Sequence, residues 1–313
     1  MEFLRILESM RTPFFNGVFQ FITLLGEETF FMVAAMIIFW CVNKRWGYFL
    51  LYVSFLGATV NQFLKLLFCV PRPWLLDENF TIVESARSAA TGYSFPSGHT
   101  QSAGGLFLGI GRLIHRVRVR ILCVILVLLV GFSRMYLGVH TPADVLVSLG
   151  LAILLVMGAS PLFHRAWTSS WKWYIPLAGI LLAWGAALVL YVECFPLPSN
   201  AIAELSANGA ATAYKMLGAA LGFTLTLYLD TRYIRFPVEA VWWVQGVKVV
   251  LGLALVIAVR MLLKDPLLAL TKGHALAGGI RYFLMVLTGG SLWPLTFRPL
   301  ARLGKPRAPA AEH

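Results

Sequence analysis

The chain has 313 residues, of which 59% are hydrophobic and only 13% are charged, and its formal net charge is +12. Its mean hydropathy of +0.77 lies far above that of soluble domains, which excludes a water-soluble enzyme. The apolar residues come in blocks of about twenty, the length of helix that crosses roughly 30 Å of hydrocarbon. The composition therefore predicts an integral membrane protein.

Nine apolar segments predict nine membrane-spanning helices, with interiors rich in Gly, Ala and Leu, as helix packing in lipid favours. The alternating ten-residue pattern of barrel strands does not occur in the sequence, so we expect an all-α bundle. The third segment is short and the seventh contains Lys215, so either could change the count by one. The segments are 27–43, 48–68, 98–113, 120–137, 143–163, 173–195, 212–229, 240–262 and 276–297.

Every second loop is rich in Lys and Arg, and such loops stay on the cytoplasmic side. The alternation predicts an outer N-terminus, a cytoplasmic C-terminus, and outer segments at 69–97, 134–142, 196–211 and 263–275. Lys264 and Lys272 depart from this pattern in the last of them. Because topology accounts for most of the positive charge, we expect no nucleic-acid partner.

Residues 1–26 place apolar side chains at helical spacing between charged ones, which predicts an amphipathic helix on the membrane surface. We divide the rest into a catalytic transmembrane core at 27–170, additional transmembrane helices at 171–297 and a basic cytoplasmic tail at 298–313. The four cysteines include no close pair such as C-x-x-C, which argues against a zinc or redox motif. Cys69 and Cys194 both fall near the outer face, where a disulfide could form.

Two cations, Lys65 and Arg72, stand at the outer end of the second segment. A lysine near a helix end can extend its side chain to the interface and have no further role. Arg72, however, lies between two prolines that restrain its backbone, and a guanidinium suits two-point contact with phosphate. The pair therefore indicates an anion site.

The sequence Pro96-Ser97-Gly98-His99 predicts the start of a helix. Proline disfavours helix in the residue before it, and Ser97 is a good N-cap. The free N–H groups of such a helix start bind anions, and Gly98 would let a phosphate approach closely. His99 then lies beside that anion, although a lone histidine at a helix start is more often a polar interface residue.

A third cluster, Ser133-Arg134 followed by His140 and Asp144, joins the fourth and fifth segments on the same outer face. Thr141 and Pro142 are typical of an N-cap and a first helical residue. Asp144 is then close enough to accept a hydrogen bond from His140, which would fix the imidazole tautomer and stabilise the cation formed when the other nitrogen attacks. The alternative is a capping carboxylate and an unrelated histidine.

Together the clusters bring three cations, two histidines and one carboxylate to one face. Phosphoryl transfer requires positive charge around the phosphate oxygens, a nucleophile in line and an acid for the leaving oxygen. The sequence shows no group of carboxylates for Mg²⁺ or Ca²⁺, and His99 and His140 without further soft ligands make a poor zinc site. We therefore expect phosphoryl transfer without a metal ion or cofactor.

These clusters resemble the signature of the type 2 phosphatidic acid phosphatase (PAP2) superfamily, K-x6-RP, PSGH and SR-x5-H-x3-D, without substitution. The resemblance covers about residues 50–165. It implies that His140 is the nucleophile and forms a phosphohistidine, that Asp144 orients it, and that His99 protonates the leaving group. It also implies that the phosphate is bound by Lys65, Arg72, Ser97, Gly98 and Arg134.

Within that superfamily we expect a lipid phosphate as substrate, because a pocket at the bilayer surface admits an acyl chain sideways. Phosphatidic acid, phosphatidylglycerol phosphate and undecaprenyl pyrophosphate fit this description. One alternative is a glucose-6-phosphatase-like enzyme, because the predicted nine spans and outer N-terminus resemble that branch. Another is a transporter or scramblase that binds a phosphate headgroup. The loop Trp74–Tyr93 bears on the choice, since its apolar residues suit a lipid and its acidic residues could hold sugar hydroxyls.

The predicted topology also gives a location. We expect an integral protein of a bacterial inner membrane, in contact with membrane lipids, with the active site facing the periplasm or exterior and the C-terminus in the cytoplasm. The sequence does not define the oligomeric state.

Overall fold

The computed structural model describes residues 1–196, 198 and 200–303, so most of the predicted basic tail 298–313 lies outside the described residues. Every regular element in the described part of the chain is helical. In chain order the elements are α1 (Glu2–Ser9), α2 (Pro13–Leu24), α3 (Glu28–Ile37), η1 (Ile38–Val42), α4 (Lys44–Phe68), α5 (Pro73–Leu76), η2 (Glu84–Ala86), α6 (Gly98–Ala103), η3 (Gly104–Leu108), α7 (Gly109–Leu113), α8 (Val117–Tyr136), α9 (Pro142–Thr168), η4 (Trp171–Trp173), α10 (Tyr174–Cys194), α11 (Ala203–Leu229), η5 (Asp230–Ile234), α12 (Trp242–Leu262), α13 (Lys264–Leu270), α14 (Leu276–Leu287), η6 (Thr288–Leu292), η7 (Pro294–Thr296) and α15 (Phe297–Leu300).

All nine predicted segments lie on helices, but the count of nine spans is not confirmed. Helix 98–113, in which η3 lies between α6 and α7, has fewer than the roughly 20 residues that a span requires, α11 contains Lys215, and α14 has only 12 residues before η6. By length and composition, five helices of the described chain can cross a membrane, or six if one pair bent by 46° is a single span. The five are Lys44–Leu76, Val117–Tyr136, Pro142–Thr168, Trp171–Cys194 and Trp242–Leu270, and the bent pair is Pro13–Leu24 with Glu28–Val42.

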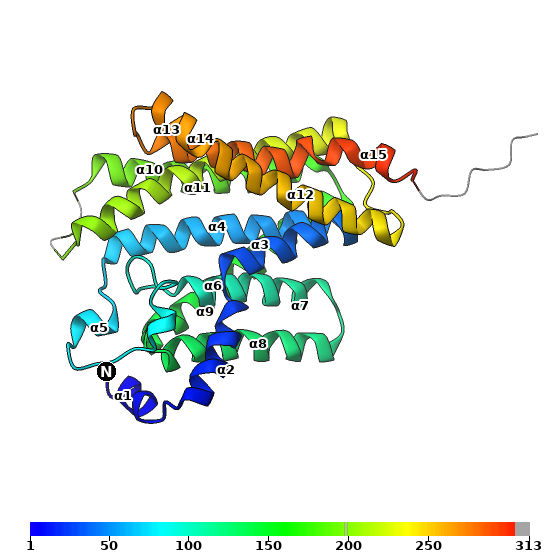
Figure 1. Cartoon of the computed structure of the whole chain (residues 1–313). Coiled ribbons are helices and arrows are strands. Elements are labelled where there is room, and N and C mark those ends of the chain that lie inside the picture. Colours follow the sequence, from blue (N-terminus) through cyan, green and yellow to red (C-terminus); the bar gives the residue numbers. More distant parts are fainter. Residues whose placement is uncertain (197, 199, 304–313) are drawn as a thin grey trace, which may run out of the picture.

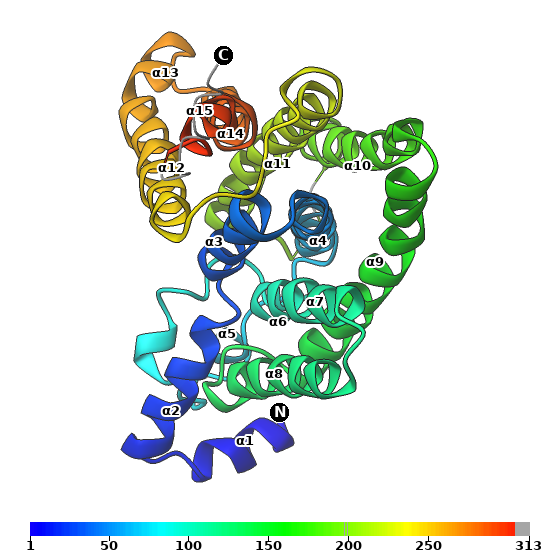
Figure 2. The same ribbon diagram turned by 90° about the vertical axis from the view of Figure 1, so that its right-hand side faces the viewer.

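Helix α4 lies at the centre of the bundle, with α6 to α9 on one side and α10, α11 and α14 on the other (Figures 1 and 2). Aromatic side chains join the two sides. The ring of Phe163 on α9 lies 5.5 Å from Phe49 and 5.4 Å from Tyr52 of α4, and Phe223 on α11 lies 6.2 Å from Tyr52. Edge-to-face and tilted pairs of this kind add specific packing to the burial of apolar area, so α4 fixes α9 and the later helices to one core.

Small residues bring α11 and α14 into backbone contact. A Cβ atom built on Gly218 would overlap the carbonyl oxygen of Gly279, and one built on Gly279 would lie 2.9 Å from the carbonyl oxygen of Tyr214. Close approach at small residues is how helices associate in lipid, where apolar burial gives little advantage. The glycines in this part of the sequence therefore have a packing function.

Two buried polar side chains fix the later helices at the opposite end of the bundle from α5. Asp230 is buried, and its Oδ2 forms an ion pair with Nζ of Lys44 at 3.0 Å. Lys248, 0% exposed, donates to the carbonyl oxygen of Val238 at 2.8 Å and lies 4.6 Å from the ring centre of Phe297. These contacts give Lys248 a structural role.

The N-terminal segment 1–26 forms two helices, and α1 is attached to the loop that follows α5. Leu4 and Leu7 are buried. The guanidinium of Arg5 lies 2.6 Å from the carboxylate of Asp77, and that of Arg11 donates to the carbonyl oxygen of Tyr136 at 2.9 Å. The predicted amphipathic helix is present, but it packs on the protein as well as exposing apolar side chains.

The close contact between α11 and α14 should contribute to the stability of the fold. The substitution Gly218→Ala should push the two backbones apart and lower the free energy of unfolding by about 1–3 kcal/mol, the usual cost of overpacking. Gly246→Ala is the matched control, because a Cβ there meets no atom within 4 Å. Thermal denaturation of both variants in one detergent measures the difference, and equal melting temperatures would contradict the proposed contact.

Candidate active site

Three separate stretches of sequence meet at the end of the bundle that carries α5 (Figure 1). The first stretch is the end of α4 with the turn before α5, the second is the start of α6, and the third is the end of α8 with the start of α9. The eight residues predicted for the site are Lys65, Arg72, Ser97, Gly98, His99, Arg134, His140 and Asp144.

His140 is held from one side by Asp144. The ring Nδ1 lies 3.3 Å from Oδ2 of Asp144, and the same oxygen accepts hydrogen bonds from Ser94 Oγ at 2.6 Å and from the backbone N–H of Thr141 at 2.8 Å. Thr141 and Asp144 form a capping box at the start of α9. The predicted hydrogen bond is thus confirmed, and it assigns the proton to Nδ1 and a lone pair to Nε2.

The other ring nitrogen of His140 faces Arg72. Nη1 of Arg72 lies 2.9 Å from Nε2 of His140 and also donates to the carbonyl oxygen of Val139 at 2.9 Å. Nε donates to the carbonyl oxygen of Gly92 at 3.0 Å, and Nη2 donates to that of Thr91 at 2.9 Å. All three nitrogens of the guanidinium are therefore engaged, and the group is only 3% exposed.

The observed conformation is closed. His140 is 1% exposed, and its Nε2 lone pair accepts a hydrogen bond from Arg72. Two cavities, of about 220 and 540 Å³, lie elsewhere in the described chain, and none of the eight site residues lines either of them. Access to Nε2 thus requires Arg72 to move or to exchange its partner.

Several donors around the site are buried and lack a partner. Nη1 of Arg134 donates to Thr23 Oγ1 at 2.8 Å, but its Nε and Nη2, and Nε2 of His99, have no hydrogen-bond partner within the described chain. Lys65 Nζ donates to the carbonyl oxygen of Tyr93 at 2.6 Å. Leaving a buried donor unpaired costs about 1–3 kcal/mol, so Arg134 and His99 fit a site that receives an anion.

The start of α6 is built as predicted. Ser97 is its N-cap, and the Ser97 Oγ accepts from the backbone N–H of Thr100 at 3.4 Å. A Cβ on Gly98 would meet no atom within 4 Å, so the glycine is not required by packing and leaves space beside the helix start. The N–H of Ser97 donates to the backbone carbonyl of Asp144 at 3.2 Å, which joins this helix start to that of α9.

The charges of the site act on both histidines. Burial lowers the pKa of His140 well below its usual value, and the charges of Arg72, Arg134, Lys65 and His99 lower it further. Burial and the charges of Arg134, Arg72 and Lys65 also lower the pKa of His99. Both effects disfavour imidazolium, so His140 is neutral at neutral pH, which is the form with a free electron pair on Nε2.

Several residues that contribute to the site could not be predicted from the sequence. Ser94 lies two residues before Pro96, but a lone serine carries no signal of its hydrogen bond to Asp144. Thr23 bonds Arg134, and Gly26 packs so closely on His99 that a Cβ would lie 2.9 Å from its carbonyl oxygen. These contacts join segments far apart in sequence, and no local pattern could have revealed them.

The described residues include no group of three or more His, Cys, Asp or Glu side chains that could hold a metal ion. All four cysteines are free thiols. Cys69 is buried and Cys194 is exposed, so the disulfide considered for this pair is not present.

Comparison with known proteins identifies the family. The PAP2 superfamily profile matches residues 45–168, and a profile described as PAP2 superfamily phosphatase, transmembrane extension, matches residues 214–306. The chain is 32% identical over 170 residues to a probable sphingosine-1-phosphate phosphatase of Dictyostelium discoideum, covering 49% of this chain and 40% of that protein. It is 37% identical over 99 residues to the undecaprenyl-diphosphatase BcrC of Bacillus subtilis, covering 32% of this chain and 48% of that protein.

A third relative is matched over most of its length. The chain is 32% identical over 159 residues to phosphatidylglycerophosphatase B of Bacillus subtilis, covering 47% of this chain and 74% of that protein. The chain spans less than half the length of the first two relatives, and no solved structure gives a significant match. The two profiles, the third relative and the arrangement around His140 agree, and the chain belongs to the PAP2 superfamily.

Proposed function

We propose that this protein is a metal-independent phosphatase that hydrolyses a lipid phosphate or lipid pyrophosphate through a phosphohistidine on His140. The observation that carries the proposal is the pair of contacts on its ring, with Asp144 at Nδ1 and Arg72 at Nε2. A carboxylate behind the imidazole stabilises the positive charge that develops during attack. A guanidinium in front lies where the phosphate must arrive.

In the first step the substrate phosphate takes the place of His140 as a hydrogen-bond acceptor of Arg72. Nε2 of His140 then attacks phosphorus, an N–P bond forms, and the bond to the leaving oxygen breaks. Lys65 and Arg134 stabilise the charge on the phosphate oxygens, and His99 gives its proton to the leaving oxygen.

The charge of the substrate prepares His99 for this role. Without substrate, burial and the surrounding cations lower the pKa of His99. A phosphate dianion among the same cations offsets their charge and favours the imidazolium. In the second step His99 takes a proton from water, the water oxygen attacks phosphorus, the N–P bond breaks, and inorganic phosphate and neutral His140 are released.

Helix α5 and the loop after it favour a lipid over a sugar phosphate. Leu75 and Leu76 are exposed, whereas the carboxylate of Asp77 is paired with Arg5 and that of Glu84 with an arginine three residues later. Acidic groups engaged in this way are less available for sugar hydroxyls. The names of the three relatives each refer to a phosphorylated lipid, which supports the same choice over a headgroup transporter.

We also propose that the catalytic unit is larger than residues 27–170, because Thr23 bonds Arg134 and Gly26 packs on His99. The charge of the loops supports an active site on the outer or periplasmic face and a cytoplasmic C-terminus. The relatives include bacterial and eukaryotic proteins, so the bacterial inner membrane stays a prediction from the sequence.

A phosphate-release panel tests the reaction and the substrate. The purified chain in EDTA should release phosphate from phosphatidic acid, phosphatidylglycerol phosphate, undecaprenyl pyrophosphate or sphingosine phosphate in preference to glucose 6-phosphate. His140→Ala should lower the rate by at least about 10³-fold, since it removes the nucleophile. His164→Ala, at an exposed histidine of α9, is the matched control and should leave the rate unchanged.

Each part of the proposal can fail separately in this panel. No phosphate release from any substrate in EDTA would contradict metal-independent catalysis. Full activity of His140→Ala would contradict the assigned nucleophile, and a strong preference for glucose 6-phosphate would contradict the lipid substrate.

Arg72 provides a second test, because its role depends on the shape of the guanidinium as well as on its charge. Arg72→Lys keeps the charge but loses the hydrogen bonds to the backbone carbonyls and the two-point contact with phosphate. Two charge-assisted hydrogen bonds of about 1.5–3 kcal/mol each correspond to a loss of roughly 10²–10⁴-fold in kcat/KM. Arg87→Lys is the matched control.

Arg87 suits this purpose because it is exposed and, like Arg72, stacks on Trp74. The guanidinium carbon lies 5.3 Å from the ring centre for Arg87 and 5.8 Å for Arg72. Arg87→Lys should change kcat/KM less than about twofold, since exposed ion pairs contribute little. Similar losses in the two variants would show that the geometry of Arg72 has no special importance.

A further inference from the structure

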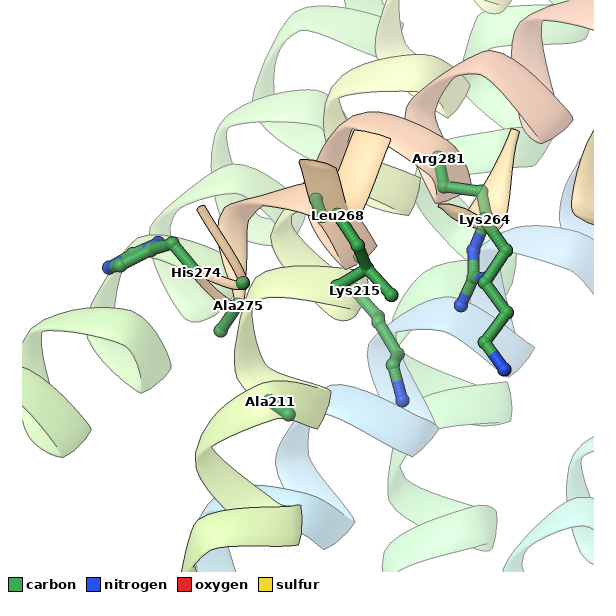
Figure 3. A pocket seen from close by; sticks show the side chains of 10 residues that line it. Ala211, Lys215, Lys264, Leu268, His274, Ala275 and Arg281 are labelled. Atoms are coloured by element: carbon green, nitrogen blue, oxygen red, sulfur yellow. The ribbon is translucent and has the colours of Figure 1, made fainter. Parts of the chain in front are cut away.

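A second basic site lies in the C-terminal part of the chain, outside the catalytic cluster. A cavity of about 220 Å³ lies between α11, α13 and α14. Figure 3 shows the side chains of Lys215, Lys264 and Arg281 gathered on one side of it and His274 on the other. Leu268 and small residues complete the lining, so the cavity combines positive charge with apolar walls.

The three cations of this cavity, Lys215, Lys264 and Arg281, have no anionic partner in the described part of the chain. None of them forms a salt bridge or donates a side-chain hydrogen bond there, and Nε of Arg281 is buried without a partner. Glu28 on α3 favours the positive charge of Lys215, but Arg281 and Arg260 oppose it. Lys215 and Arg281 are half-buried, and like charges held close together and partly out of water repel unless an anion joins them.

Membrane topology does not explain these charges. Lys264 stands in the segment 263–275, where the alternation of basic loops predicts an outer position and few cations. Helix α13 lies at the same end of the bundle as α5 (Figure 1). Positive charge that departs from the topology rule and lines a cavity points to binding.

The surroundings indicate a ligand with an apolar tail. Leu268 and Leu270 on α13 and Leu276 at the start of α14 are exposed and would contact lipid in a membrane. A phosphate held by Lys215 and Arg281 would thus have acyl chains beside exposed leucines. Arg and Lys at the membrane surface attract anionic lipids by this combination of charge and burial.

We propose that this cavity, the extension pocket, binds the phosphate group of an anionic membrane lipid. It shares no residue with the catalytic site, so the proposal does not rest on the proposed phosphatase activity. Free phosphate offers the same oxyanion, and the two sources are separated by experiment.

The test is native mass spectrometry of the purified full chain in a neutral detergent, titrated with phosphatidylglycerol or phosphatidylcholine. Phosphatidylglycerol is a phosphodiester, so binding is measured without phosphomonoester hydrolysis. The double variant Lys215→Gln/Arg281→Gln should bind it about 25-fold more weakly, at roughly fivefold per cation. The matched control Lys272→Gln/Arg302→Gln removes the same charge from residues outside the pocket and should bind as the wild type does.

Lys264→Gln provides a single substitution at an exposed residue, where loss of folding is not expected, and should weaken binding about fivefold. Binding of phosphatidylcholine should be equal in all variants. A parallel thermal-shift measurement uses inorganic phosphate as the probe.

The outcomes separate the sources. Loss of phosphatidylglycerol binding in the pocket variants alone supports the lipid. Stabilisation by inorganic phosphate that is lost in the double variant, with unchanged lipid binding, supports the same site with free phosphate as its ligand. If the pocket variants match the control toward both probes, the proposal is overturned, whether or not the protein hydrolyses any phosphate.

Discussion

The contact between Arg72 and Nε2 of His140 is the interaction on which the rest of the site depends. A guanidinium 2.9 Å from the ring opposes protonation of that nitrogen, while Asp144 holds the proton on the other one. In a buried setting these electrostatic effects are stronger than in water. The protein therefore keeps a neutral imidazole whose lone pair points at a buried guanidinium, the cation that we propose binds the substrate phosphate.

Arg72 also holds the architecture of the site together. Its carbonyl partners come from the loop before α6, at Thr91 and Gly92, and from the turn before α9, at Val139. Gly92 has φ = +68°, a conformation that glycine adopts without strain. One guanidinium thus joins the end of α4 to the starts of α6 and α9. Because α4 lies at the centre of the bundle, the later helices support the site through their packing on it.

Features that depend on neighbours in the sequence could be predicted from it. The nine apolar segments are all helical, the N-caps Ser97 and Thr141 are where the sequence places them, and the i, i+4 spacing of His140 and Asp144 correctly predicted their hydrogen bond. Caps and i, i+4 pairs depend on neighbours in sequence, so sequence reveals them. The roles of the eight site residues stay predictions that this geometry supports.

The remaining features depend on tertiary structure. The carbonyl clamp on Arg72, the bond from Thr23 to Arg134 and the grouping of Lys215 with Arg281 join segments that no periodicity connects. The count of nine spans is not confirmed for a different reason, because the helices at 98–113, α11 and α14 are too short or too polar to pass as spans by length and composition. Lys264 is an exception, since its position in the segment 263–275 departs from the alternation of loop charge in the sequence itself.

The most direct test of the central claim is to trap the covalent intermediate. The chain is mixed with phosphatidic acid carrying a labelled phosphate, quenched in alkaline detergent within milliseconds, and digested for mass spectrometry. The account predicts a label that is stable in base, lost in acid and located on His140, and no label in His140→Ala. Labelling of His99, or rapid phosphate release with no labelled protein at any time, would contradict it.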